Sequence, residues 1–365
     1  MSCKDFSLNL PLNTVSFGQV STLILRELYK RDSNKVLPIF PMGGTIDFSS
    51  QEVNQEFMEW VTRGVDQSHA IHSSQNPCFK LWHLNGGLES PSRSLNLLTF
   101  YELDEPTKHE INVVKNCDKV LFTNKYTQKV FESSGVKSNV VPLAFDNYNF
   151  SKLDKRFFDD DRIVFNLCGK FEKRKNHKKI ISSWVKKFGN NRKYFLQCAI
   201  FNPFISEEQN KQLFAEAVGS THYFNVQFLG SMKENKLYND FLNSGNIVIG
   251  MSGGEGWGLP EFQSVGIGKY AVIMNATGYQ EWANADNSVL VEPAGKIDSS
   301  DGMFFKKGTP FNQGRIYDFN EDDFISGCEE AIKKVEKNII NQEGVKLQEK
   351  FTASKMVDSI LGVLT

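Results

Sequence analysis

The 365-residue sequence lacks several features that would place it in a special class of protein. No run approaches the ~20 apolar residues that cross a bilayer, and the first residues do not read as a signal peptide. No two cysteines form a Cys-x-x-Cys pair, which argues against a zinc site or a disulfide framework. We therefore expect a cytoplasmic protein without a transmembrane segment, with free thiols at Cys3, Cys78, Cys117, Cys168, Cys198 and Cys328.

A large charge of either sign is also missing. The 42 basic and 43 acidic residues leave a formal net charge of −1, so a generally basic face for nucleic acid is not indicated. Internal repeats and low-complexity segments are absent from the sequence as well. Since a typical domain has ~100–200 residues, the length favours two domains.

What the sequence does contain is a regular alternation of short apolar runs and longer amphipathic stretches. This alternation is typical of βαβ units and parallel sheets. It stops at a polar, charged stretch, SKLDKRFFDDDR (151–162), and then begins again with RIVFNLCG. We therefore predict two doubly wound, Rossmann-like domains facing each other across a cleft, with boundaries at 1–155 and 156–345. Residues 346–365 are expected to form a terminal helix that crosses back to the first domain.

The most informative segment is GGEGWGLP, residues 253–260. An apolar strand, NIVIGMS, runs into four glycines that surround one carboxylate, Glu255, and a helix follows near Pro260. Glycines let a backbone approach a ligand closely. Amide groups at a helix N-terminus favour an anion, while a carboxylate accepts hydrogen bonds from hydroxyls. A ligand that carries both phosphate and sugar fits this combination.

This segment resembles the donor-site motif E-G-x-G-L-P of the retaining GT-B glycosyltransferases, the glycosyltransferase family 4-like group. The residues from Glu255 to Pro260 match it in order. The resemblance implies that Glu255 binds hydroxyls of the donor sugar. It also implies a donor-binding role for the backbone at Gly254, Gly256, Trp257, Gly258 and Leu259. The family's second glutamate, which usually holds the nucleotide ribose, is replaced by Gln263, whose amide can still bond two hydroxyls.

A second match lies in FNLCGKFEKRKNH (165–177), which resembles the family's first strand and loop of the donor domain. Lys170 and Lys175 occupy the two basic positions that neutralise the donor diphosphate in that family. Fixed cations aimed at the leaving group would stabilise the charge that develops as the glycosidic bond breaks. Because Lys170 stands where arginine is more common, it would supply a point charge and no bidentate contact.

The first half of the sequence resembles the family more loosely. Gly18, in the first strand-to-helix loop, would approach the donor and face the acceptor. Tyr101 stands where the family often has a histidine that contacts the donor sugar, and Glu102 follows it at the same strand end. His83 ends another strand before a glycine pair, so it is a further candidate for the cleft, although a structural role is equally open.

The resemblance implies transfer of a hexose from a UDP- or GDP-sugar to a hydroxyl acceptor, with retention of configuration. No cofactor and no metal are expected, and the Asp159–Asp161 run is interpreted as a solvated charge run. The acceptor stays open between a polysaccharide, a lipid-linked glycan and a hydroxymethylated DNA base. A weakly active or inactive sugar-nucleotide binder and a sugar-nucleotide epimerase on the same fold are the alternatives.

Overall fold

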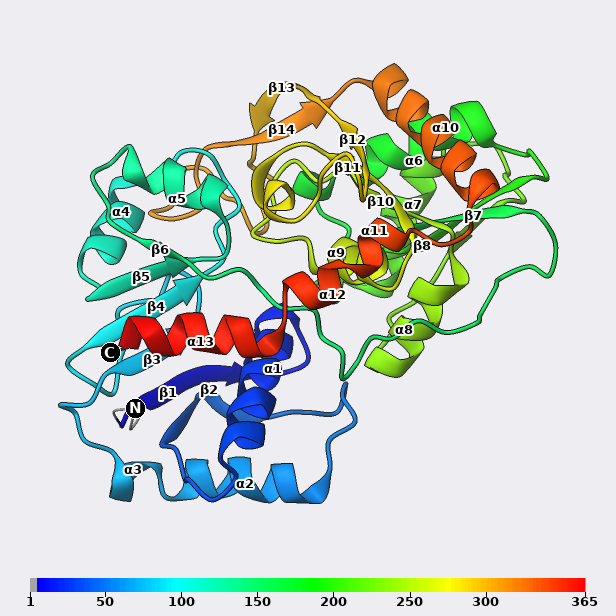
Figure 1. Cartoon of the computed structure of the whole chain (residues 1–365). Helices are drawn as coiled ribbons and strands as arrows, with labels where there is room; N and C mark the ends of the chain where they lie inside the picture. The colour runs from blue at the N-terminus through cyan, green and yellow to red at the C-terminus, as the bar shows by residue number, and fades with distance from the viewer. Residues whose placement is uncertain (1–4, 365) are drawn as a thin grey trace.

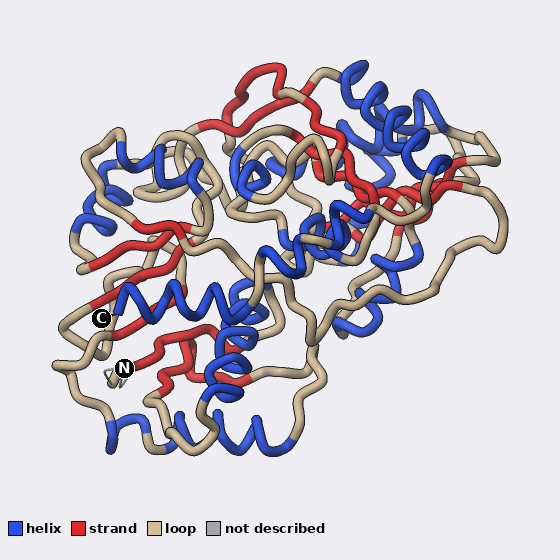
Figure 2. Tube along the Cα trace, in the orientation of Figure 1, coloured by secondary structure: helices blue, strands red, loops and turns tan. Residues whose placement is uncertain are grey.

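The computed structural model describes residues 5–364 as two parallel β-sheets with flanking helices (Figure 1). Figure 2 shows the strands of the two sheets within their halves, with helices and loops around them, and a separate pair of strands at the top edge of the view. Cys3 lies outside the described residues, and the other five cysteines are free thiols. No helix within residues 5–364 is long and apolar enough to cross a membrane.

The first sheet has the strand order β2-β1-β3-β4-β5-β6, and every neighbouring pair in it is parallel. Its strands are β1 (Ser7–Leu12), β2 (Ile39–Ile46), β3 (Cys78–Leu81), β4 (Leu95–Thr99), β5 (Lys119–Phe122) and β6 (Asn139–Val140). The helices of this half are α1 (Ser16–Arg31), α2 (Gln55–Asp66), α3 (Ser68–Ile71), α4 (Lys108–Lys115) and α5 (Lys125–Glu132).

The second sheet has the order β12-β11-β10-β7-β8-β9 and is also parallel throughout. Its strands are β7 (Ile163–Cys168), β8 (Tyr194–Ala199), β9 (Val226–Phe228), β10 (Ile247–Gly250), β11 (Tyr270–Met274) and β12 (Val289–Val291). The helices are α6 (His177–Phe188), α7 (Glu207–Val218), α8 (Asn235–Ser244), α9 (Leu259–Gly266) and α10 (Glu321–Lys337), with 3-10 turns η1 (Lys173–Lys175) and η2 (Thr277–Glu281). Strands β7 and β10 are buried along their whole length, which explains their near-continuous apolar sequences.

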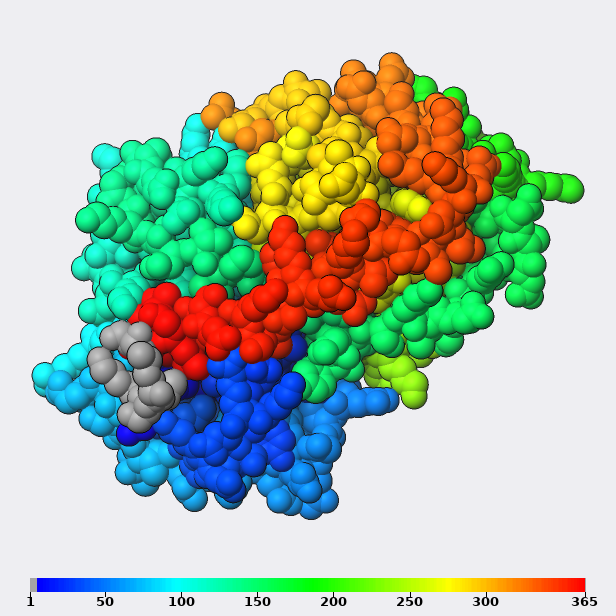
Figure 3. Space-filling view, viewed as in Figure 1, coloured from blue at the N-terminus to red at the C-terminus, as the bar shows by residue number. Residues whose placement is uncertain are grey.

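The chain returns to the first half at its end through α11 (Gln342–Val345), α12 (Leu347–Lys350) and α13 (Ala353–Leu364). Helix α13 packs against α1, and Arg31 forms an ion pair of 2.7 Å with Asp358. In the space-filling view this terminal segment, coloured red, lies across the junction of the two halves (Figure 3). One apolar core accordingly continues from the first half through Phe145, Phe262 and Phe351 into the second.

A β-hairpin that the sequence analysis did not assign stands outside both sheets. It consists of β13 (Pro293–Asp298) and β14 (Arg315–Phe319), paired antiparallel. β13 is mostly exposed and has no regular apolar alternation, which is the signal that predicts a half-buried strand. Its tip nevertheless packs into the first half, where Phe305 and Ile316 join the core cluster around Leu97.

Candidate functional site

The glycine-rich segment lies at the carboxyl end of β10, a central strand of the second sheet, and leads directly into α9. Ligands of open α/β sheets bind outside this edge. Gly258 is the N-cap of α9 and has φ +82°. A Cβ atom there would lie 2.2 Å from the Tyr279 ring, so both the backbone conformation and the packing require glycine.

At two other positions of the loop, Gly254 and Gly256, glycine is required by the close packing of the first half. A Cβ atom on Gly254 would lie 2.4 Å from the carbonyl oxygen of Glu102, and one on Gly256 would lie 2.7 Å from Cβ of Phe100. In this structure the space beside both glycines is thus taken by the chain that follows β4. Contacts of Gly254 and Gly256 with a donor remain a prediction.

Two side chains that follow β5 in the first half hydrogen-bond to the glycine-rich loop of the second half. Thr123 Oγ1 and Asn124 Nδ2 both donate to the carbonyl of Gly256, at 2.5 and 2.7 Å. The Oδ1 atom of Asn124 accepts the amide of Thr127 and so caps α5. The start of α5 is therefore bound directly to the loop that carries Glu255.

Glu255 is buried beneath the loop and bound by two cations. Its Oε1 atom pairs with Nζ of Lys175 and lies 3.0 Å from the Arg174 guanidinium. Arg174 also pairs with Glu172 at 2.8 Å and with Glu102 at 3.0 Å. Arg174, which was not among the predicted site residues, thus joins carboxylates from both halves of the molecule.

The electrostatics of this cluster keep its central members ionised. Burial would raise the pKa of Glu255, but the charges of Lys175 and Arg174 outweigh that cost and lower it to about 2. Burial would likewise lower the pKa of Lys175, and the Glu255 carboxylate raises it instead. Glu255 is therefore a carboxylate at neutral pH and can only accept hydrogen bonds.

A further carboxyl group, Glu261, lies beside this cluster. The sequence analysis did not include it among the site residues, but α9 places it in the interior, where it is 2% exposed. A Cβ atom on Gly250, at the end of β10, would lie 2.9 Å from Cγ of Glu261. Burial raises the pKa of Glu261 to about 7; Lys175 opposes this shift, and Glu255 adds to it.

Lys170 is the predicted basic residue whose charge is not neutralised by an ion pair within residues 5–364. It is half-buried, and no carboxylate of residues 5–364 forms an ion pair with it. Its Nζ atom lies over two aromatic rings, 5.2 Å from the centroid of Phe204 and 4.6 Å from that of Phe304. These rings fix the position of the ammonium group without neutralising its charge.

Three residues of the first half were predicted to contact the cleft, and the structure separates them. The carboxylate of Glu102 pairs with Arg174, the Glu102 side chain as a whole being 29% exposed. Desolvation of the carboxylate is the main cause that raises its pKa. His83 has an exposed side chain. Neighbouring groups nevertheless desolvate its imidazole, and this desolvation, together with the charge of Lys170, lowers the pKa of His83 to about 4. The prediction for Tyr101 is corrected, because its ring is 4% exposed and its hydroxyl donates to Glu110 within the core.

Two more predicted residues are placed by packing. The Trp257 indole is 2% exposed and packs edge-on against Phe262 and Phe351, so its side chain belongs to the core that joins the two halves. Gly18 is closed off by its own loop, since a Cβ atom there would lie 1.9 Å from the carbonyl oxygen of Asn13. Local packing therefore requires glycine at position 18, and its contact with donor or acceptor stays a prediction.

Gln263 lines a cavity of about 250 Å³ between the halves. Its Oε1 atom accepts the amide of Asp146 at 3.4 Å. Leu259 and Pro260 of the same helix line the cavity from the second half. The first half contributes Thr14, Ser16, Gln19, Val20, Leu23, Ser50, Ala144, Asp146 and Phe150. Its volume is just below the ~300 Å³ at which typical small-molecule sites begin.

The β13–β14 hairpin closes over the same region from the other side. Asp104, which is 4% exposed, forms ion pairs of 2.8 Å with Lys296 and 3.2 Å with Arg315. Nearer the tip, Thr107 donates to the carbonyl of Pro310, and Glu110 accepts the amide of Asn312. The hairpin therefore joins the second half to the segment after β4, next to Glu102.

Metal ligands were not expected at this site. Within residues 5–364 no group of three or more His, Cys, Asp or Glu side chains is arranged to hold a metal ion. In the acidic run before β7, Asp160 forms an ion pair of 2.8 Å with Arg162. Metal independence of any activity stays a prediction.

Comparison with solved structures identifies the fold. The sucrose-phosphate synthase of Thermosynechococcus elongatus superposes with a TM-score of 0.68 at 10% identity over 99% of this chain and 98% of that one. A glycosyltransferase from Rickettsia africae gives 0.66 at 11% identity, over 100% and 98%. WaaG, a glycosyltransferase of lipopolysaccharide biosynthesis, gives 0.62 at 8% identity, with 99% of each chain covered. No family model and no curated protein matches the chain.

Proposed function

We propose that the chain transfers a hexose from a nucleotide-diphosphate sugar to a hydroxyl acceptor. The proposal starts from its GT-B fold, which confirms the predicted fold class. The observation that carries the proposal is the buried Lys175–Glu255 pair beneath a glycine-rich loop, at the carboxyl edge of β10 and opposite the first half. A fixed carboxylate for sugar hydroxyls next to fixed cations is the chemistry that a sugar diphosphate requires.

In this proposal each part of the donor has its own partner. Glu255, ionised at neutral pH, accepts hydroxyls of the sugar. Lys170, which no carboxylate of the described chain neutralises, and the amide end of α9 receive the diphosphate. Gln263 and the cavity of about 250 Å³ that it lines accommodate part of the nucleoside. UDP- and GDP-sugars are the expected donors.

We infer transfer with retention by front-side attack. The bond between the anomeric carbon and the phosphate oxygen breaks, and the acceptor oxygen bonds to the same face of that carbon. The acceptor proton passes to the departing phosphate oxygen. Glu255 is engaged by Arg174 and Lys175, so it is better suited to hold hydroxyls than to act as a nucleophile. Lys170 offsets the charge gained by the leaving group, and no metal is required.

The test is thermal stabilisation by a panel of UDP-, GDP- and ADP-sugars. A donor at 100 times its dissociation constant adds ~2.7 kcal/mol to the free energy of unfolding. Lys170→Met is the informative variant because Lys170 is half-buried and unpaired, whereas Lys178→Met removes an exposed charge on α6 and is the control. Stabilisation by one nucleotide class, weakened by Lys170→Met alone, supports the donor site. No stabilisation by any donor would refute it.

The chemical step has a separate readout. NMR of the product would give the anomeric configuration, and an inverted product would overturn front-side transfer. Acceptors would be compared as three classes: polysaccharide, lipid-linked glycan and hydroxymethylated DNA. Stabilisation by a donor without transfer to any class would indicate a sugar-nucleotide binder, and turnover of donor alone would indicate an epimerase.

A further inference from the structure

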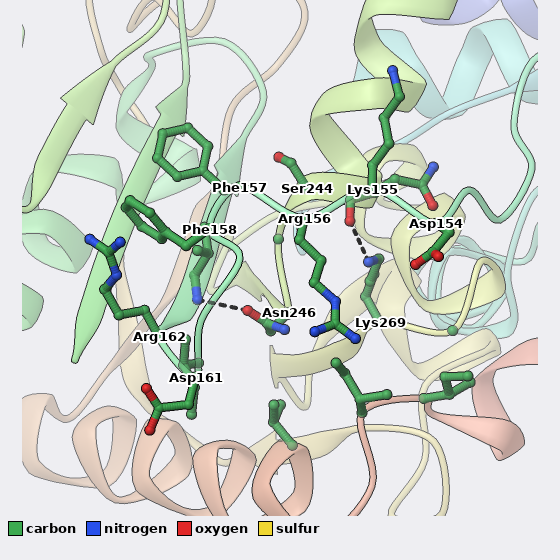
Figure 4. Close-up of a pocket in the computed structure, with 18 of the residues that line it drawn as sticks. Asp154, Lys155, Arg156, Phe157, Phe158, Asp161, Arg162, Ser244, Asn246 and Lys269 are labelled. Carbon is green, nitrogen blue, oxygen red and sulfur yellow. Dashed lines mark hydrogen bonds between the residues drawn. The ribbon is translucent and has the colours of Figure 1, made fainter.

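A second cavity, of about 450 Å³, lies at the other end of the second half (Figure 4). One wall is the 152–164 segment that links the halves, and another is the end of α10 with residues 339–340. The remaining wall is formed by the residues just before β10 and β11, at 243–246 and 267–269. This cavity therefore opens at the amino ends of the strands, whereas the glycine-rich loop lies at their carboxyl ends.

The charges around this cavity do not balance locally. Six lysine and arginine residues and four acidic residues line it. Three of the cations are neutralised, in the pairs Lys155–Asp240 (2.5 Å), Arg162–Asp160 (2.8 Å) and Lys193–Glu336 (2.6 Å). The other three, Lys152, Arg156 and Lys269, form no ion pair with any carboxylate of residues 5–364. Two lining carboxylates, Asp154 and Asp161, are also outside the ion pairs of the described chain, so a net positive charge is left.

The unpaired cations converge. Figure 4 shows the Arg156 guanidinium and the Lys269 side chain projecting into the same space, while Lys155 extends the other way. Lys269 is half-buried and donates from Nζ to the carbonyl of Asn243 at 2.5 Å. Burial and the nearby charges of Lys152 and Arg156 lower its pKa to about 8. Lys152 and Arg156 are exposed at the mouth of the cavity and Lys269 is half-buried beside them, so a bound anion would relieve the repulsion among the three charges.

The cavity also has an apolar side, formed by Ile267, Val335, Ile339 and Ile340. A bare inorganic anion would use only the cationic part of the space. A ligand with a phosphate group on an organic body would use both parts. Guanidinium groups bind phosphate oxygens in a bidentate manner, and an ammonium adds a point charge.

We propose that this cavity is a binding site for a phosphate monoester, with Arg156, Lys269 and Lys152 around the phosphate and the isoleucine side against its organic part. The site is separate from the candidate donor site and does not depend on the proposed function. One wall of the cavity is the segment between the halves and another is the end of α10. A bound ligand would therefore contact both and hold them together.

The experiment is isothermal titration of the whole protein with phenyl phosphate at constant ionic strength. Arg156→Gln should weaken binding about tenfold or more, as expected for loss of a charge-assisted contact. Arg156 is exposed and makes no ion pair within the described chain, so the variant should melt like the wild type. Lys155→Gln is the matched control, since it removes the neighbouring charge, which points away and is already paired.

Lys170→Met separates this site from the donor site, because it should leave phenyl phosphate binding unchanged while weakening nucleotide-sugar binding. Equal binding by Arg156→Gln and Lys155→Gln, or no saturable binding up to about 10 mM, would overturn the proposal. A second arm distinguishes the source of the phosphate. Sedimentation with phosphatidic acid vesicles, lost in Arg156→Gln and competed by phenyl phosphate, would identify a lipid headgroup; titration without sedimentation would identify a small soluble ester.

Discussion

The Nζ atom of Lys175 lies against Oε1 of Glu255, and both side chains are about 95% buried beneath the glycine-rich loop. The pair joins the 3-10 turn after β7 to the loop after β10, so two segments far apart in the sequence meet as opposite charges. Arg174 adds a second cation at 3.0 Å. The balance of these charges determines how much the buried pair contributes to stability.

Removing both partners of this pair should cost less than the sum of removing each one alone. Glu255→Gln is expected to lower the free energy of unfolding by about 3 kcal/mol, because the buried Lys175 ammonium then loses its carboxylate partner. Lys175→Met should cost less, about 2 kcal/mol, because Glu255 keeps Arg174 at 3.0 Å. The double variant should lose clearly less than the sum, with a coupling above about 1 kcal/mol. Urea denaturation of the four proteins measures this cycle.

The control for that cycle is the exposed pair Lys178–Glu216, at 3.3 Å. Its side chains are 63% and 45% exposed, so water screens the interaction and the coupling should stay below about 0.5 kcal/mol. Equal couplings in the two cycles would show that burial of Lys175 and Glu255 has no energetic consequence.

Glu261 should make stability depend on pH. Its pKa is raised from 4.5 to about 7, so the folded chain binds this proton more tightly than the unfolded chain does. The free energy of unfolding should therefore fall as pH rises from about 4.5 to about 7. Glu261→Gln removes this dependence and should gain stability relative to the wild type across that window, by about 3 kcal/mol at pH 8.

Denaturation curves at several pH values check the difference between Glu261→Gln and the wild type. Glu329→Gln is the comparison, since Glu329 is 44% exposed on α10 and pairs with Lys187. Its difference from the wild type should stay within about 0.5 kcal/mol throughout. A flat difference for Glu261→Gln as well would mean that Glu261 is ionised at its ordinary pKa.

Gly258 should tolerate no side chain. Its φ of +82° disfavours any L-residue, and a Cβ atom would meet the Tyr279 ring at 2.2 Å. Gly135, just after α5, has φ +73° with nothing within 4 Å of a Cβ atom, and the amide of Val136 donates to the carbonyl of Phe131 as at a helix end with a left-handed residue, so it isolates the backbone term. We expect Gly135→Ala to cost about 1 kcal/mol and Gly258→Ala about 3 kcal/mol or more, measured by thermal denaturation. Equal costs would show that the Tyr279 ring yields freely.

Asp104 should hold the β13–β14 hairpin against the first half. Asp104→Asn weakens the ion pairs with Lys296 and Arg315, and should cost about 1–2 kcal/mol because both partners are partly exposed. Trypsin should then cut faster at Lys306 and Lys307 near the hairpin tip. Glu105→Gln is the control, since Glu105 is 61% exposed and contacts only Arg315 among these groups. Unchanged cleavage in Asp104→Asn would mean that apolar packing alone holds the hairpin.

Much of the fold could be predicted because each element carries its own signal. Apolar runs such as IVFNLC and IVIG are buried along their length, and they became β7 and β10. The hairpin could not be predicted in this way, since β13 is largely exposed and is stabilised by contacts with Asp104 and the segment after β4. The hairpin is stabilised by residues about 190 positions earlier in the chain, and the sequence of the hairpin itself gives no signal of these contacts.

The residues of the candidate site also fall into those that the sequence predicted and those that only the structure revealed. The sequence by itself determined that a glycine-rich turn with Glu255 ends a buried strand, and that Lys170 and Lys175 follow another, because backbone freedom and strand burial are local properties. Only the tertiary structure decided that Arg174 and Glu261 join Glu255, that Tyr101 turns into the core, and that Gly18 is closed by Asn13. These outcomes depend on which elements pack together, because burial and pairing across long separations determine the position and charge of each side chain.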